Sequence, residues 1–149
     1  MSPKPADIKI QKKPIAQGVP DAWVRKIIRT TLTAEKSKKR FVSILLTNNK
    51  EIHAINKKFL KHDYATDVIS FEPGSGHLVG KEADYLGDIV VSVDMAQSVA
   101  KDLGIPWREE LARYLVHGTL HLLGYDDHAT ADREKMSGRQ EKIVEKIIR

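Results

Sequence analysis

The sequence predicts an α+β fold in which about five helices pack on a single mixed sheet of about four strands. Short β-prone or alternating segments recur along the chain, and longer segments carry apolar residues three and four positions apart. The two kinds of segment follow one another in mixed order, which is typical of this fold class. No internal repeat, low-complexity tract or linker divides the 149 residues, so we expect one domain over residues 1–149.

The first half of the chain predicts two strands and two helices. The strands are a short alternating one over residues 8–12 and a buried one over 41–47. Pro20 suits the first turn of a helix that ends in the following basic run. Asn48 or Asn49 can cap the second helix. One face of the first helix carries Trp23, Val24, Ile27, Ile28, Thr31 and Leu32, and one side of the second carries Ile52, Ile55, Asn56 and Phe59.

The second half predicts two strands, a connecting loop and three helices. Asp94 is the expected cap of the first of these helices, and the segment from Gly104 to Pro106 ends it. The last helix offers Met136, Ile143, Ile147 and Ile148 for burial. The expected bounds are 66–71 and 85–93 for the strands, 74–84 for the loop, and 94–103, 107–123 and 131–148 for the helices.

Composition argues against a secreted, disulfide-bonded or membrane-spanning protein and favours one that binds a polyanion. The absence of cysteine excludes disulfides and thiolate catalysis, and no segment is apolar enough for a secretory signal or a membrane span, so we expect a cytoplasmic protein with no membrane partner. The net charge of +5 and the clustered lysines favour a polyanionic partner. Scattered aromatic residues indicate no aromatic-rich RNA platform.

Three of the six histidines fall within residues 117–128, and this segment predicts a metal site. His117 and His121 are four apart in a helical pattern, so both imidazoles lie on one side of the helix, one turn apart. Gly124 ends the helix and lets the chain fold back to present His128. Three protein ligands leave a position open on zinc for an activated water, which is the arrangement of a hydrolase.

Two other interpretations of this segment are less favoured. A histidine pair at helical spacing also occurs as an ordinary interior pair or a solvated stripe, but the third histidine beyond Gly124 favours a metal site. A closed structural zinc site without cysteine is uncommon. Zinc proteases of the H-E-x-x-H type carry a general-base glutamate after the first histidine, where this chain has Gly118, so that class is disfavoured.

Three ordered motifs resemble the YbeY family of bacterial metal-dependent endoribonucleases. The segment 117–128 is similar to the family's H-G-x-L-H-L-x-G-Y-D-H, and residues 56–71 are similar to its N-x-x-[YF]-R-x-x-D-x-x-T-D-V-L-S-F. Between them, residues 86–92 are similar to its L-G-D-I-x-I-S strand. The resemblance implies the same α+β architecture, with the histidine helix packed on the sheet like that of a zinc protease.

The chain departs from the family pattern at two positions. The family's third histidine falls at Asp127, one residue before His128, so His128 is the predicted third ligand and Asp127 is the alternative ligand or its orienting partner. The family's arginine near the scissile phosphate aligns with Leu60, which cannot stabilise a negative charge. The neighbouring lysines are predicted RNA-binding residues, or else a solvated helix face: Lys57, Lys58 and Lys61.

The resemblance implies a single-strand-specific endoribonuclease with one zinc ion. It also implies a part in maturing the 3′ end of 16S ribosomal RNA and in ribosome quality control, with ribosomal RNA and the small ribosomal subunit as partners and no DNA substrate. The sequence identifies no general base, and the same histidines suit nickel or copper. Two alternatives stay open: a metallohydrolase of another substrate, and a ribosome-associated RNA-binding protein with a structural metal.

Overall fold

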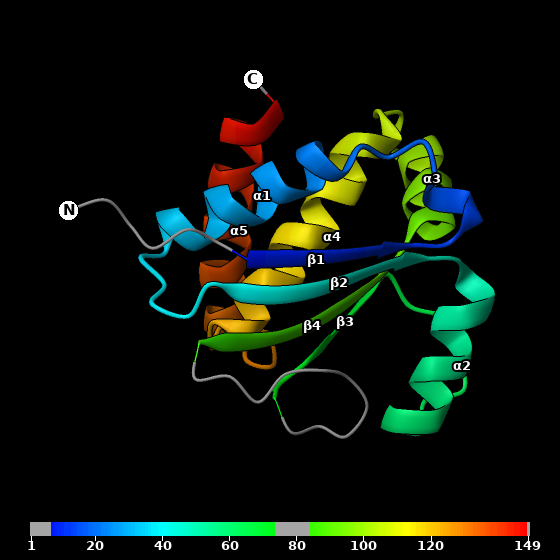
Figure 1. The fold of residues 1–149 in the computed structure, drawn as a ribbon, viewed down its shortest axis with the longest axis horizontal. Coiled ribbons are helices and arrows are strands. Elements are labelled where there is room, and N and C mark those ends of the chain that lie inside the picture. The colour runs from blue at the N-terminus through cyan, green and yellow to red at the C-terminus, as the bar shows by residue number, and fades with distance from the viewer. Residues whose placement is uncertain (1–6, 74–83, 149) are drawn as a thin grey trace.

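A computed structural model describes residues 7–73 and 84–148 of the chain (Figure 1). It confirms the predicted α+β fold, with a four-stranded mixed sheet and five α-helices. Among the helices described, none combines the length and apolar character needed to cross a bilayer. The elements in chain order are β1 (Asp7–Lys12), a 3-10 turn (Pro14–Ala16), α1 (Asp21–Ala34), β2 (Phe41–Thr47), α2 (Asn49–Leu60), β3 (Val68–Phe71), β4 (Tyr85–Ser92), α3 (Val93–Leu103), α4 (Trp107–Leu122) and α5 (Thr130–Ile148).

The sheet has the strand order β1-β2-β4-β3. β1 and β4 run parallel to β2, and β3 pairs antiparallel with β4 at one edge. Helices cover both faces of β4, and all of its residues are buried. A strand buried on both faces needs apolar residues in succession, which the run Ile89–Val91 supplies.

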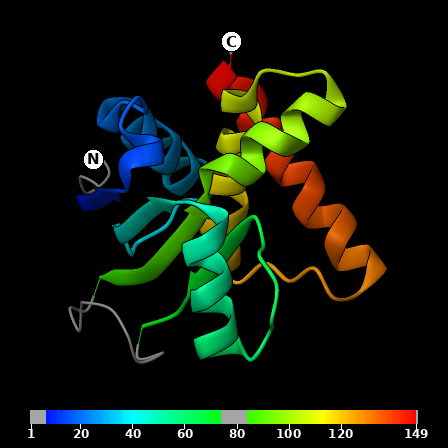
Figure 2. The ribbon, with the colours of Figure 1, turned by 90° about the vertical axis from the view of Figure 1, so that its right-hand side faces the viewer.

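Two apolar cores lie on opposite faces of the sheet. The larger contains Ile89 and Val91 of β4 together with buried residues of α1, α3, α4 and α5. The smaller contains Val90 of β4, Ile69 and Phe71 of β3, and Ile52 of α2. Figures 1 and 2 both show α2 apart from the other helices. The sheet edge at β3 therefore has α2 on one face and α4 on the other.

Helix α4 lies directly against the sheet at Gly118. A Cβ atom built on Gly118 would lie 2.8 Å from Ile89 Cγ2 and 3.0 Å from Val68 Cγ2. The Ser70 hydroxyl of β3 donates a hydrogen bond of 2.8 Å to the Gly118 carbonyl. Only glycine permits this approach, so the position after the first histidine faces the sheet and has no room for a glutamate.

Several predicted bounds and caps differ in detail. Asn48 caps α2 as predicted, by accepting from the Glu51 amide at 2.8 Å. The cap of α3 is Ser92 and not Asp94, because Asp94 instead accepts from the Asn49 amide and holds the starts of α2 and α3 together.

Other bounds shift by a few residues. Helix α1 ends at Ala34, before the basic run, and β3 starts only at Val68, because the Asp67 carboxylate binds the Val68 amide. Ile148 is half exposed and not buried. Most of the predicted loop 74–84 lies outside the described residues.

Candidate metal centre

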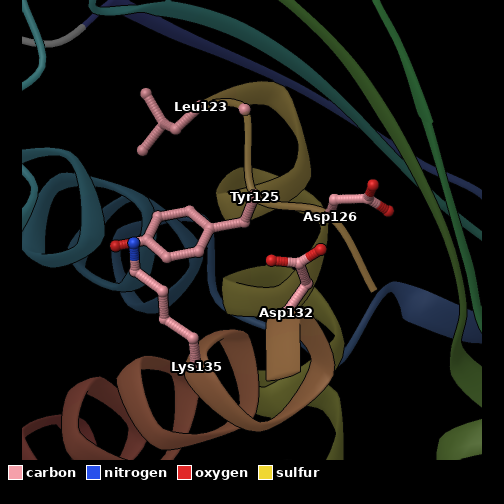
Figure 3. A pocket seen from close by; sticks show the side chains of 6 residues that line it. Leu123, Tyr125, Asp126, Asp132 and Lys135 are labelled. Atoms are coloured by element: carbon pink, nitrogen blue, oxygen red, sulfur yellow. The ribbon is translucent and has the colours of Figure 1, made fainter. Parts of the chain in front are cut away.

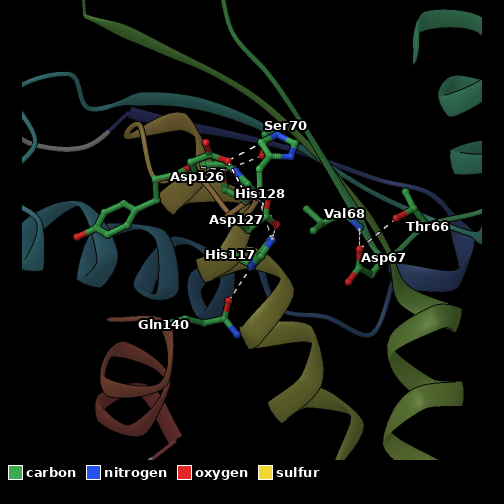
Figure 4. A network of polar contacts seen from close by, with 12 residues as sticks. Thr66, Asp67, Val68, Ser70, His117, Asp126, Asp127, His128 and Gln140 are labelled. Atoms are coloured by element: carbon green, nitrogen blue, oxygen red, sulfur yellow. Dashed lines mark hydrogen bonds and ion pairs between the residues drawn. The ribbon is translucent and has the colours of Figure 1, made fainter. Parts of the chain in front are cut away.

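Helix α4 and the loop after it bring three metal-ligating side chains together (Figure 4). The Nε2 atoms of His117 and His121 lie 3.1 Å apart. Asp127 Oδ2 lies 3.7 Å from the first and 3.3 Å from the second. All three side chains are partly exposed, so a substrate can reach them. The predicted convergence of the two imidazoles is present, and Asp127 completes the cluster.

Hydrogen-bond partners determine which nitrogen of each imidazole carries the proton. His117 Nδ1 lies 2.8 Å from Gln140 Oε1, and His121 Nδ1 lies 3.1 Å from the Tyr125 carbonyl. Both partners only accept, so each ring nitrogen must donate. Gln140 is oriented by its amide nitrogen, which donates to Glu141. In the neutral tautomer that these partners favour, each Nε2 is unprotonated, and both Nε2 atoms face the same point, as metal-binding imidazoles do.

The spacing of these three atoms fits one zinc ion. Bonds of about 2.0–2.1 Å in tetrahedral geometry place two ligand atoms about 3.3 Å apart. The observed separations of 3.1, 3.3 and 3.7 Å scatter around this value. Two nitrogens and one oxygen form a donor set that zinc accepts, and three protein ligands leave one position for water or substrate.

His128 lies outside this cluster. Its side chain is 91% exposed, and its Nε2 lies 3.6 Å from Asp126 Oδ1. The Asp126 carboxylate accepts from the His128 amide at 2.9 Å and makes a local turn there. Asp126, Asp127 and His128 form a second, overlapping group of ligand atoms. The structure thus brings the predicted ligands His117 and His121 together with Asp127, the alternative third ligand. His128 as the third ligand stays a prediction.

A partly buried carboxylate, that of Glu35, holds the metal-site loop against α1 and α5. The Tyr125 hydroxyl donates to Glu35 at 2.5 Å, and Arg139 of α5 pairs with the same carboxylate. Burial alone would raise the pKa of Glu35, but these hydrogen bonds and the arginine charge together hold it below its usual value. In Figure 3, Tyr125 points toward Lys135 of α5, and the Lys135 ammonium lies 6.0 Å from the ring centre. The loop is thereby fixed at Tyr125, whose carbonyl orients His121.

A cleft of about 940 Å³ runs from the metal cluster to the end of α2. At one end it is lined by His121, Asp127 and His128, and at the other by residues of α2, β3 and the segment between them. Leu60, where the family pattern has arginine, lines this cleft and is 41% exposed. The other lining residues are Asn56, Phe59, His62, Tyr64, Thr66, Val68, Ile69, Ser70, Phe71, Glu72 and Leu122.

The three predicted RNA-binding lysines are exposed near the end of α2 but do not line the cleft. The Lys57 ammonium lies 3.9 Å from Asp63, and that of Lys58 lies 5.2 Å from the centre of the Phe59 ring. Lys61 has a left-handed backbone with a φ of 61° and turns the chain out of the helix. Their role in RNA binding stays a prediction.

A second, smaller pocket adjoins the metal cluster on the side of α5. It has a volume of about 240 Å³ and is lined by His117, Asp127, Arg133, Met136, Ser137 and Gln140. Arg133, whose guanidinium donates to the Thr130 hydroxyl at 3.2 Å, therefore shares a pocket with two of the candidate ligands. Sequence reasoning missed both Arg133 and Gln140, because only the packing of α5 on α4 brings them to the histidines.

Comparison with known proteins identifies the family. The sequence model of the family described as Endoribonuclease YbeY matches residues 6–148. The chain belongs to the YbeY family. This confirms the resemblance seen in the three motifs, and with it the prediction of an endoribonuclease, a hydrolase that acts on RNA.

Individual relatives cover most of the chain. The YbeY endoribonuclease of Brevibacillus brevis (strain 47) is 42% identical over 118 residues, which are 71% of this chain and 74% of that protein. That of Sulfurihydrogenibium sp. (strain YO3AOP1) is 35% identical over 141 residues, with 94% and 91% covered. The solution structure of TM1509 from Thermotoga maritima matches with a TM-score of 0.63 and 24% identity, covers 94% of this chain and 88% of that one, and shows the same fold.

Proposed function

We propose that this chain is a zinc-dependent endoribonuclease specific for single-stranded RNA. One observation carries the proposal: the Nε2 atoms of two histidines, 3.1 Å apart, and a carboxylate oxygen converge at the wall of a cleft of about 940 Å³. The cleft is open, and it lies beside a lysine-bearing helix end. These are features that a flexible polyanion requires.

His117 and His121 supply two ligands, and Asp127 supplies the third in the geometry described, with His128 as the alternative. A bound zinc ion supplies an activated water or polarises an oxygen of the scissile phosphate. Gln140 and the Tyr125 carbonyl hold the protons on both Nδ1 atoms and so keep the Nε2 lone pairs available.

Two groups of positively charged side chains are expected to assist RNA cleavage, one at the scissile phosphate and one along the RNA backbone. Arg133 lies in the small pocket beside His117 and Asp127, where its guanidinium can pair with phosphate oxygens as charge develops on them. Arg133 thereby supplies the guanidinium that the family pattern has at the position of Leu60. Lys57, Lys58 and Lys61 attract the RNA backbone toward the cleft through Coulomb forces that weaken as salt rises.

The cellular role we propose follows the family. Maturation of the 3′ end of 16S ribosomal RNA and ribosome quality control are its expected tasks, in the cytoplasm, with ribosomal RNA and the small subunit as partners. Family membership supports this assignment, and the exposed basic end of α2 is compatible with it.

The test is cleavage of single-stranded and duplex RNA by protein purified without a histidine tag. We expect zinc-dependent cleavage of the single strand, loss of cleavage in His117→Ala, and full cleavage in the control His53→Ala. His53 lies on α2 and pairs with Asp63 of the following segment, outside the metal cluster. Equal cleavage by folded His117→Ala would refute the proposal.

Two other outcomes would favour the alternative functions. If chelation unfolds the protein while folded metal-ligand variants keep wild-type activity, the protein is an RNA-binding protein with a structural metal. If it cleaves peptides or small phosphate esters but not RNA, it is a metallohydrolase of another substrate.

A further inference from the structure

We propose that His62 and Tyr64 form a stacking subsite for one unpaired nucleobase of the RNA. The proposal rests on the proposed function and specifies how the cleft engages its substrate. The two rings are stacked, with centroids 5.4 Å apart and planes inclined by only 9°. Tyr64 is 55% exposed, and it is the one tyrosine, tryptophan or phenylalanine of the described residues whose side chain is mostly open to solvent. An exposed ring already backed by a parallel ring offers a flat surface to a base.

Buried Asn56 holds the backbone of both ring residues in place. Asn56 is 2% exposed. Its side-chain amide donates to the Tyr64 carbonyl at 3.0 Å, and its backbone carbonyl accepts from the His62 amide at 3.2 Å. Lys61 makes the turn between helix and loop with its left-handed backbone. The backbone that carries the two rings is therefore held in place before any ligand binds, which lowers the entropy cost of binding.

The position of the pair connects it to the metal cluster. His62 and Tyr64 line the same cleft as His121, Asp127 and His128. A strand whose phosphate lies at the metal cluster can thus place a nearby base on the rings. Leu60, also on the cleft wall and 41% exposed, adds apolar surface beside them.

The chemistry of this surface selects an unpaired base. Stacking on an aromatic ring uses the π face that every base has, so it tolerates all four bases. A base inside a duplex already has both faces covered and must be extruded before it can stack, which costs free energy. The ring pair therefore gives the cleft a preference for single strands that does not depend on sequence. The lysines of α2 nearby favour a nucleic acid over an aromatic peptide as the occupant.

The test measures binding of a labelled single-stranded oligoribonucleotide to the full chain by fluorescence anisotropy, with chelator present so that the RNA stays intact. We expect Tyr64→Ala to weaken binding about 5- to 150-fold, the range for loss of one stacked base. Tyr64→Phe should bind as wild type does, because it keeps the ring. Tyr64→Leu, which keeps apolar bulk without a π face, should behave like the alanine variant. Circular dichroism checks that each variant is folded.

An abasic oligonucleotide of the same length separates a base contact from an indirect effect. On abasic RNA the wild type and Tyr64→Ala should bind with equal affinity. Wild-type affinity of Tyr64→Ala or Tyr64→Leu for normal RNA would overturn the subsite, and so would a loss of equal size on normal and abasic RNA. Failure of the proposed function looks different, because the wild-type protein itself would then neither bind nor cleave single-stranded RNA.

Discussion

Replacing Gly118 by alanine tests how α4 is seated on the sheet. The added Cβ would lie 2.8 Å from Ile89 Cγ2, 3.0 Å from Val68 Cγ2 and 3.2 Å from Ser70 Oγ. These separations are too short, so α4 and the sheet must move apart. Overpacking of this kind costs about 1–3 kcal/mol. Alanine also favours the helix over glycine by about 0.5–1 kcal/mol, so we expect the free energy of unfolding to fall by up to about 2.5 kcal/mol.

Gly138 provides the matched control. It lies in α5 on the surface, and a Cβ built there meets no atom within 4 Å. Gly138→Ala therefore gains the helix preference without the clash and should raise the free energy of unfolding by about 0.5–1 kcal/mol. The gap between the two variants, about 1–3 kcal/mol, isolates the packing cost.

Urea unfolding of both variants, followed by circular dichroism with chelator present, measures this gap without a contribution from bound metal. Zinc affinity is a second readout, because α4 carries both histidines, and it should fall in Gly118→Ala alone. Equal shifts in the unfolding free energies of the two variants would refute the close packing of α4 on β3 and β4.

Three further predictions concern the groups around the metal cluster. Gln140→Leu removes the acceptor of the His117 Nδ1 proton, so zinc affinity measured against a competing chelator dye should fall about 10- to 100-fold, whereas Gln97→Leu on the exposed side of α3 should leave it unchanged. Arg133→Gln should lower the rate of RNA cleavage about 100-fold with unchanged zinc affinity, and an unaltered rate would exclude Arg133 from charge stabilisation. Glu35 has a lowered pKa in the folded protein, so its charge stabilises the fold at pH values above the ordinary 4.5, and this contribution is lost as the pH falls through the folded pKa. In urea unfolding, Glu35→Gln should therefore cost about 1–3 kcal/mol at pH 7 and progressively less in acid, and a cost independent of pH would contradict the pairing with Arg139.

The histidine helix was predictable because its information is local. A spacing of four residues determines where two side chains point on a helix, and Gly124 has the positive φ of 99° that ends it there. The choice between Asp127 and His128 was not predictable in the same way. The two residues are adjacent in the loop, and the spacing of the motif does not say which side chain lies near the imidazoles; in the structure Asp127 does.

Contacts between segments far apart in the chain could not be predicted from the sequence. Glu35 and Tyr125 are 90 residues apart, and no spacing rule connects them. Asp94 and Ser92 both carry an oxygen suited to capping α3, and only the contact of Asp94 with the start of α2 shows why Ser92 is the cap. The stacked pair of His62 and Tyr64 likewise depends on Asn56 holding the backbone between them.

Zinc stoichiometry and affinity in untagged protein test the central claim most directly, that two unprotonated imidazole nitrogens and one loop ligand hold a single cation. Isothermal titration should show one zinc ion per chain in the wild type and in His53→Ala. In His121→Ala we expect affinity reduced by at least about 100-fold, and comparison of Asp127→Ala with His128→Ala identifies the third ligand. Wild-type zinc binding by folded His121→Ala, or no zinc binding by the wild type, would contradict the account.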